Sequence, residues 1–129
     1  MPNVWVTQEN PSFNYLPAEE YGEVNFITAQ DFSPMANSLT NVAVINSIRD
    51  ALTRFNADED FILPSGSPVV SAAVFMAVGR ITKKARVLKW SNRDQNYIPI
   101  TGIPSFLNLS ARAPNPSPTI SITTQSGFG

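Results

Sequence analysis

Hydrophobic residues recur with two different spacings along the chain, the two-residue spacing of a strand and the 3.6-residue spacing of a helix. Three segments have strand character. Residues 4–7 are rich in β-branched and aromatic side chains, and residues 23–28 alternate polar and apolar positions. Residues 61–63 are wholly apolar, as expected for a strand at the centre of a sheet covered on both faces. We therefore predict three strands here, with the last one central.

The longer periodicity marks a helix over residues 41–56. Ile45, Ile48, Leu52 and Phe55 recur there at helical spacing. Val44 and Ala51 widen this apolar stripe. Arg49, Asp50, Thr53 and Arg54 face away from it, so one face of this helix is apolar and the other is polar. The pattern predicts an amphipathic helix packed on the sheet.

A second helix is predicted to begin at Pro68 and to end near Gly79 or Lys83. Ser67 is a helix-capping residue type, and proline is favoured in the first helical turn. This helix is apolar on nearly every face, which is typical of a buried element or an interface. We expect a buried core helix, and self-association through it, with help from Phe106 and Leu107, is the alternative.

The remaining residues predict a hairpin, a long connection and a tail. Residues 86–90 and 97–100 read as two strands around a polar turn, and Pro99 suggests that the second strand lies at an edge. Residues 9–22 form a loop whose aromatic residues should pack on the core as a lid or edge cover. The order predicts one α/β domain over residues 1–103, with α+β as the alternative: a small mixed sheet of four or five strands with two main helices. Residues 104–129 are rich in Pro, Ser and Thr and predict an extended tail.

The amino-acid composition excludes several kinds of catalytic and metal-binding site. The 129 residues include no histidine and no cysteine. Ser-His-Asp catalysis, thiolate catalysis and cysteine-based metal sites are therefore excluded. We expect a protein that is not an enzyme and has no cofactor and no bound metal.

Acidic and basic residues are distributed unevenly. Residues 1–60 contain nine acidic and two basic side chains, whereas residues 61–129 contain one acidic and seven basic side chains. Six of the bases fall within residues 80–93. Either the two halves attract each other, or the basic segment binds nucleic acid or a nucleotide with the help of an aromatic ring. The candidate residues for that second reading are Lys83, Lys84, Arg86, Lys89, Trp90 and Arg93.

Two further groups of residues are candidate sites. Ser65, Gly66 and Ser67 join a strand to a helix, and the backbone amides of such a turn can bind an anion. The alternative is an ordinary capped helix start. A second group, formed by Asp31 and the acidic residues 58–60, could hold Mg²⁺, although acids are also common in solvated turns.

Several short stretches resemble a family of small, mostly uncharacterised α/β proteins encoded by tailed bacteriophages. They are Tyr21-Gly22-Glu23-Val24, Asp60-Phe61-Ile62-Leu63 with Ser65-Gly66-Ser67-Pro68, and Leu88-Lys89-Trp90 with Asn96-Tyr97-Ile98-Pro99-Ile100. The resemblance covers residues 1–100. Two positions where the family often has aspartate are Ser67 and Ser91 here, which argues against any acid-dependent activity.

The resemblance implies a viral accessory or virion-associated role. We expect a non-enzymatic protein that acts through protein–protein contact or self-association, with a copy of itself or another viral protein as partner. Nucleic acid is the alternative partner. The N-terminal residues lack the pattern of a secretory signal, and the longest apolar run, residues 69–78, is about half a membrane span. We therefore expect the host cytoplasm or the virion as the location, and no membrane association.

Overall fold

The computed structural model describes the backbone of residues 1–104 and the side chains of residues 1–101. The predicted tail, including Phe106 and Leu107, lies outside the described residues. The elements in chain order are β1 (Asn3–Gln8), the 3₁₀ helix η1 (Leu16–Glu20), β2 (Glu23–Thr28), α1 (Leu39–Arg54), β3 (Phe61–Leu63), α2 (Pro68–Val78), β4 (Lys84–Ser91) and β5 (Asn96–Pro104).

The strands form one mixed sheet in the order β2-β1-β3-β4-β5. The first four strands are parallel, and β5 pairs antiparallel with β4. This confirms the predicted α/β class, with a five-stranded sheet and two main helices. The hairpin strands are longer than predicted, because β4 begins at Lys84 and β5 continues to Pro104.

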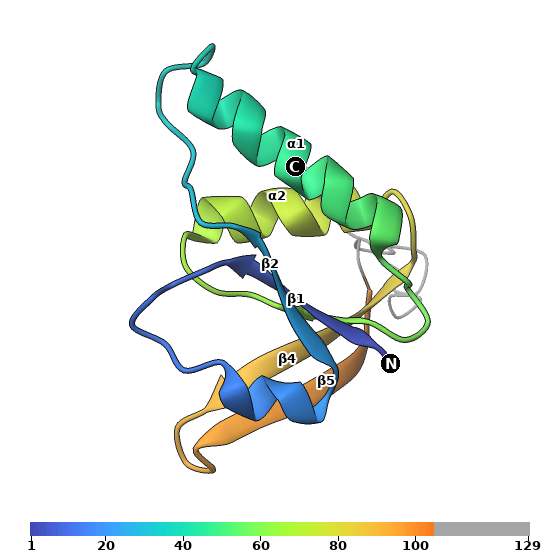
Figure 1. Ribbon diagram of the computed structural model, residues 1–129. Helices are drawn as coiled ribbons and strands as arrows, with labels where there is room; N and C mark the ends of the chain where they lie inside the picture. Colours follow the sequence, from blue (N-terminus) through green and yellow to red (C-terminus); the bar gives the residue numbers. More distant parts are fainter. Residues whose placement is uncertain (105–129) are drawn as a thin grey trace, which may run out of the picture.

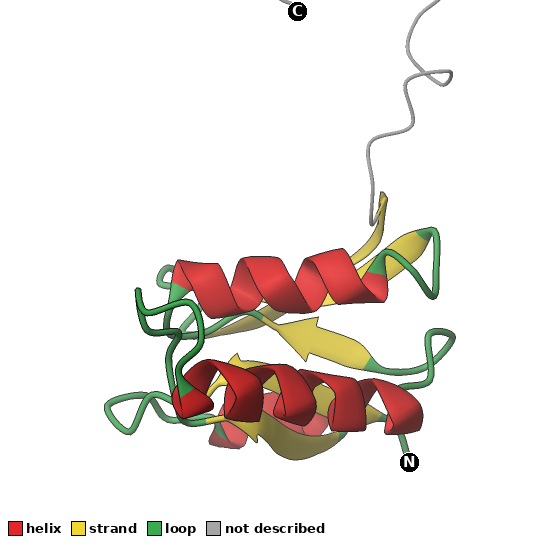
Figure 2. Cartoon of the chain, turned by 90° about the horizontal axis from the view of Figure 1, so that it is seen from above, coloured by secondary structure: helices red, strands yellow, loops and turns green. Residues whose placement is uncertain are grey.

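The direction of each connection decides which face it covers. The β2-α1-β3 and β3-α2-β4 connections advance in the same direction across the sheet, so right-handed crossovers place both helices on one face. The β1–β2 connection moves the opposite way and therefore lies on the other face. Figure 1 shows α1 and α2 above the sheet and η1 below it, and Figure 2 shows the two long helices side by side.

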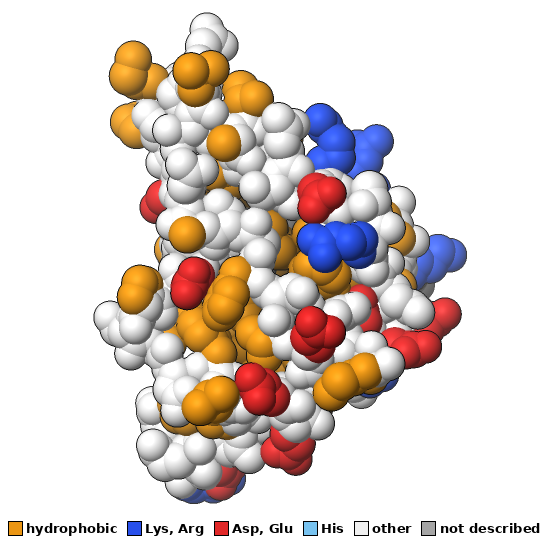
Figure 3. Space-filling model, viewed as in Figure 1, with side chains coloured by type: hydrophobic (Ala, Val, Ile, Leu, Met, Phe, Trp, Pro, Cys, Tyr) orange, Lys and Arg blue, Asp and Glu red, His pale blue; other side chains and the backbone are white. Residues whose placement is uncertain are grey.

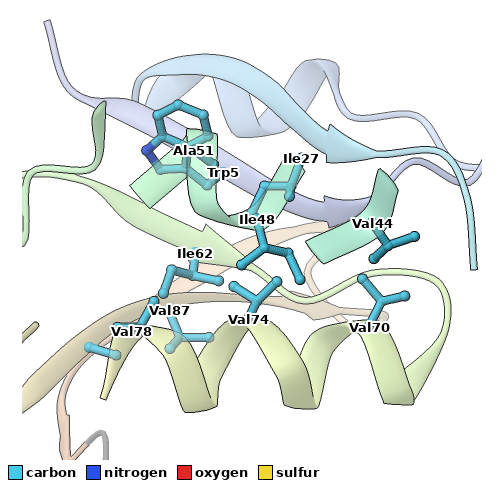
Figure 4. Close-up of a cluster of buried hydrophobic side chains, with 11 residues drawn as sticks. Trp5, Ile27, Val44, Ile48, Ala51, Ile62, Val70, Val74, Val78 and Val87 are labelled. Atoms are coloured by element: carbon cyan, nitrogen blue, oxygen red, sulfur yellow. The ribbon is translucent and has the colours of Figure 1, made fainter. Parts of the chain in front are cut away.

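The core between the helices and the sheet consists of Trp5 and aliphatic side chains, mostly valine and isoleucine (Figure 4). α2 contributes Val70, Val74 and Val78, which recur every four residues and are at most 1% exposed. Burying each of these valines contributes about 1.5–3 kcal/mol. The facing residues of α1 are Val44, Ile48 and Ala51.

A second core lies on the opposite face, beneath the β1–β2 connection. Tyr15 and Ala18 from this connection are buried there against Val4, Phe61 and further sheet residues. The prediction that residues 9–22 pack on the core as a cover is thus confirmed. The sequence did not predict the 3₁₀ helix η1 within this segment.

Candidate functional site

The sheet has one topological switch point, between β1 and β3. The chain leaves the carboxyl end of β1 toward one face and the carboxyl end of β3 toward the other. The order 2-1-3-4-5 is a common doubly wound arrangement, and such sheets bind ligands outside the carboxyl ends of the strands at the switch point. A ligand site is therefore expected at this edge of the sheet.

A buried hydrogen-bond network holds the edge together. The backbone N–H of Ser65 donates to Thr7 Oγ1 at 2.9 Å, and the Thr7 hydroxyl lies 2.9 Å from the Ser65 carbonyl oxygen, to which it donates. Tyr15 Oη accepts from the backbone N–H of Asn10 at 2.8 Å and lies 2.7 Å from Ser65 Oγ. The β1 end, the β3 end and the β1–β2 connection are thus fixed relative to one another.

The predicted anion turn lies in this network, and the amides of Ser65 and Ser67 already have acceptors. The Ser67 N–H donates to the side-chain oxygen of Gln8, and the Val69 N–H donates to Ser67 Oγ at 3.2 Å. Gly66 between them has a φ of 77°, a left-handed conformation that favours glycine. Ser67 is therefore the N-cap of α2, as predicted. An anion would have to displace these side-chain contacts, and its binding stays a prediction.

A pocket of about 690 Å³ opens beside this network, on the face that carries η1. Its walls come from the loop after β1, the carboxyl ends of β3 and β4, and the beginning of β5. The lining residues are Ser12, Phe13, Asn14, Leu63, Pro64, Ser65, Val87, Leu88, Lys89, Trp90, Gln95, Tyr97 and Ile100. A shallower hollow on the other side of Phe13 reaches the start of α2.

Trp90 and Tyr97 face each other across the β4–β5 ladder and form one wall of the pocket. Their ring centroids are 5.0 Å apart in an edge-to-face arrangement. Trp90 is 38% exposed, whereas Tyr97 is only 5% exposed. Burial raises the pKa of the Tyr97 phenol above its usual 10.0, and the neighbouring Tyr15 adds to the rise.

The structure does not gather the basic segment into one surface. Lys83 immediately precedes β4 and Lys84 is its first residue, whereas Arg93 lies in the turn after its end, about 23 Å away along an eight-residue strand. The Arg86 guanidinium lies over the ring of Phe61, with its central carbon 4.4 Å from the ring centroid. Figure 3 shows Lys and Arg side chains in separate groups with acidic side chains between them.

Among the described residues, no ion pair joins the acidic half of the chain to the basic half. Their two ion pairs are Arg54–Asp50 and Arg93–Asp94, and each joins neighbours within one half of the chain. Nucleic-acid binding by Lys83, Lys84, Arg86, Lys89, Trp90 and Arg93 stays a prediction.

The acidic residues are separated as well. Within the described residues no three acidic side chains converge on a point that could hold a metal ion. Asp60 is 2% exposed, and its carboxylate accepts from the backbone N–H of Asn3 at 2.9 Å and of Asn56 at 2.8 Å, and from the Trp5 indole N–H at 3.0 Å. These three donors give Asp60 a structural task at the amino edge of the sheet.

α2 corrects the prediction of a buried core helix. Only the stripe of Val70, Val74 and Val78 is buried, while Val69 is 59% and Met76 is 76% exposed. The reason is geometric, because a helix in the outer layer of a domain can bury only the side that meets the elements beneath and beside it. The opposite side of α2 remains open in the single chain.

Comparison with protein-family models gives a match to the Phage Pam3 gp32-like protein over residues 2–102. This chain belongs to the Pam3 gp32-like family. The resemblance to phage-encoded proteins is thus confirmed. Comparison with curated proteins and with solved structures gives no significant match.

Membership of the Pam3 gp32-like family shows the phage origin of the protein. Among the described residues, neither of the two α-helices has the length and apolar character needed to cross a membrane. The pocket was missed by the sequence analysis, because Phe13 is far from Trp90 and Tyr97 in the chain. The one available signal was the unusual number of aromatic residues in the loop at 9–22.

Proposed function

We propose that this phage protein is a non-enzymatic accessory or virion-associated protein that acts through protein–protein contact, and that its first partner is a second copy of itself. The proposed contact surface is the outer face of α2, formed by Val69, Ala72 and Met76. The exposure of this face is the observation that carries the proposal: Val69 is 59% and Met76 is 76% exposed.

The chemistry of α2 suits contact with an identical surface. The helix sequence, PVVSAAVFMAV, contains no charged residue. In a two-fold symmetric dimer each group near the axis meets its own copy, so charges there would repel, whereas apolar groups do not. The small side chains of Ala72 and its neighbours also allow two helices to approach closely.

The adjoining helix α1 also carries exposed apolar side chains. Leu39 is 86% and Val42 is 50% exposed at the beginning of α1. Figure 2 shows α1 beside α2 on the same side of the sheet. Exposed apolar side chains on two neighbouring helices of one face favour an interaction surface on this side of the sheet.

The test is the mass of the full chain in solution, measured by size-exclusion chromatography with light scattering over a range of concentrations. The wild-type protein is expected to dimerise. Met76→Lys should weaken the dimer at least about tenfold, because two like charges would meet at a symmetric contact. Leu16→Lys is the matched control, since Leu16 is 65% exposed but lies on η1, on the other face of the sheet.

A wild-type chain that stays monomeric at the highest concentration would refute self-association. An unchanged dimer in Met76→Lys, with native circular dichroism, would refute the assignment of the surface to α2.

A further inference from the structure

We propose that the pocket at the carboxyl edge binds an uncharged planar heteroaromatic molecule of nucleoside size. Its position is the first argument. The loop after β1, the end of β3 and the end of β4 all contribute to its walls. This is the edge of a doubly wound sheet at which ligands bind, next to the switch point. The volume of about 690 Å³ lies within the usual range for small-molecule sites.

The walls of the pocket suit a flat ring. Phe13, Trp90 and Tyr97 come from three different elements and line the same space. Phe13 is 55% and Trp90 is 38% exposed, so both rings have free surface on which another ring can stack. Stacking on aromatic side chains is the main way in which proteins hold nucleobases without reading their sequence.

The charges at the pocket indicate an uncharged ligand. Among the described residues that line it, Lys89 is the only charged one, and none is acidic. Lys89 pairs with Ile98, one step along the ladder from the Trp90–Tyr97 pair. Because successive residues of a strand point to opposite faces, its side chain leaves on the helix-bearing face. The pocket therefore has no cation directed at a phosphate.

The hydrogen-bonding side chains around the pocket are neutral, and one of them is held in place by a buried contact. Asn14 and Gln95 provide amides, and Ser12 and Ser65 provide hydroxyls. Ser65 is 7% exposed and is fixed by its contact with Tyr15 Oη. Neutral donors and acceptors of this kind match the polar edges of a heterocycle.

The ligand surface is independent of the proposed dimer surface. Leu63, Leu88 and Tyr97 line the pocket and belong to the core on the η1 side of the sheet. α2 lies on the opposite side of the sheet (Figure 1), and its outer face points away from the sheet. Binding in the pocket and dimerisation through α2 can therefore be tested separately, and either can fail without the other.

The experiment is isothermal titration of the full chain with adenosine and with thymidine, a purine and a pyrimidine nucleoside. We expect saturable one-to-one binding of at least one of them. Phe13→Ala and Trp90→Ala should each weaken that binding by about tenfold or more through lost stacking. Phe26→Ala should leave it unchanged, because Phe26 is a 42% exposed aromatic that contacts Tyr15 on the same face but does not line the pocket.

Adenosine monophosphate tests the charge argument and is expected to bind no more tightly than adenosine. The proposal is overturned if neither nucleoside binds at millimolar concentration, or if Phe13→Ala and Trp90→Ala both bind as the wild type does. Tenfold tighter binding of the monophosphate would overturn the uncharged class of ligand.

Discussion

Removal of the Asp60 carboxylate should strongly destabilise the domain. Its two oxygens accept three hydrogen bonds, from the backbone N–H groups of Asn3 and Asn56 and from the Trp5 indole. The bonds join the beginning of β1 to the α1–β3 connection and fix a tryptophan that is 2% exposed in the main core. Asp60 is thus an anchor of the amino edge of the sheet.

The expected loss of stability depends on whether each hydrogen-bond donor finds another acceptor once the Asp60 carboxylate is removed. Hydrogen bonds to an ionised group contribute about 1.5–3 kcal/mol each, and a buried donor left without a partner costs about 1–3 kcal/mol. The Asn56 amide lies near the surface and can bind water, whereas the Trp5 indole cannot. We therefore expect Asp60→Ala to lower the free energy of unfolding by about 3–5 kcal/mol, and Asp60→Asn by about 2–3 kcal/mol, since an amide oxygen can still accept from part of the set.

The assay is urea denaturation followed by circular dichroism and by tryptophan fluorescence, to which the buried Trp5 and the 38% exposed Trp90 both contribute. Trp5→Phe, alone and combined with Asp60→Asn, completes a double-mutant cycle that isolates the indole contact. A loss below about 1 kcal/mol in Asp60→Ala would refute this account of the amino edge. Stabilisation of the wild type by magnesium, abolished in Asp60→Asn, would show instead that the acid holds a metal ion.

Two further predictions concern the site edge. Gly66→Ala should lower the free energy of unfolding by about 2 kcal/mol in the same urea assay, because φ is 77° there and a β-carbon would meet the Gln8 side chain; an unchanged midpoint would contradict this. Tyr97 should make the protein sensitive to alkali, because burial raises the pKa of its phenol above 10.0 in the folded state. The stability that the neutral phenol contributes is therefore full below pH 10 and is lost as the pH rises through the folded pKa. Tyr97→Phe should therefore lose less stability than the wild type between pH 9 and about 11.5, measured by thermal unfolding, and equal losses would refute the assignment.

The sequence by itself determined the local elements of this protein. The helical spacing of Ile48 and Leu52, the apolar run at residues 61–63 and the capping role of Ser67 were all predicted and are present. These features depend on the residue itself and on neighbours a few positions away, so one-dimensional patterns are sufficient to find them. The phage-family resemblance is also carried by short local motifs, and it too is confirmed.

Only the tertiary structure decided where the functional surfaces lie. Phe13 and Trp90 are far apart in the sequence but line one pocket. The strand order brings the loop after β1 close to the carboxyl ends of β3 and β4. Conversely, Lys84 and Arg93 are close in sequence and far apart in space because an extended strand separates them. An apolar helix does not reveal which of its sides is covered, since this depends on how many layers pack around it. Strand order and the number of layers depend on contacts between residues far apart in the sequence. They determine where the pocket lies and why the outer face of α2 is exposed.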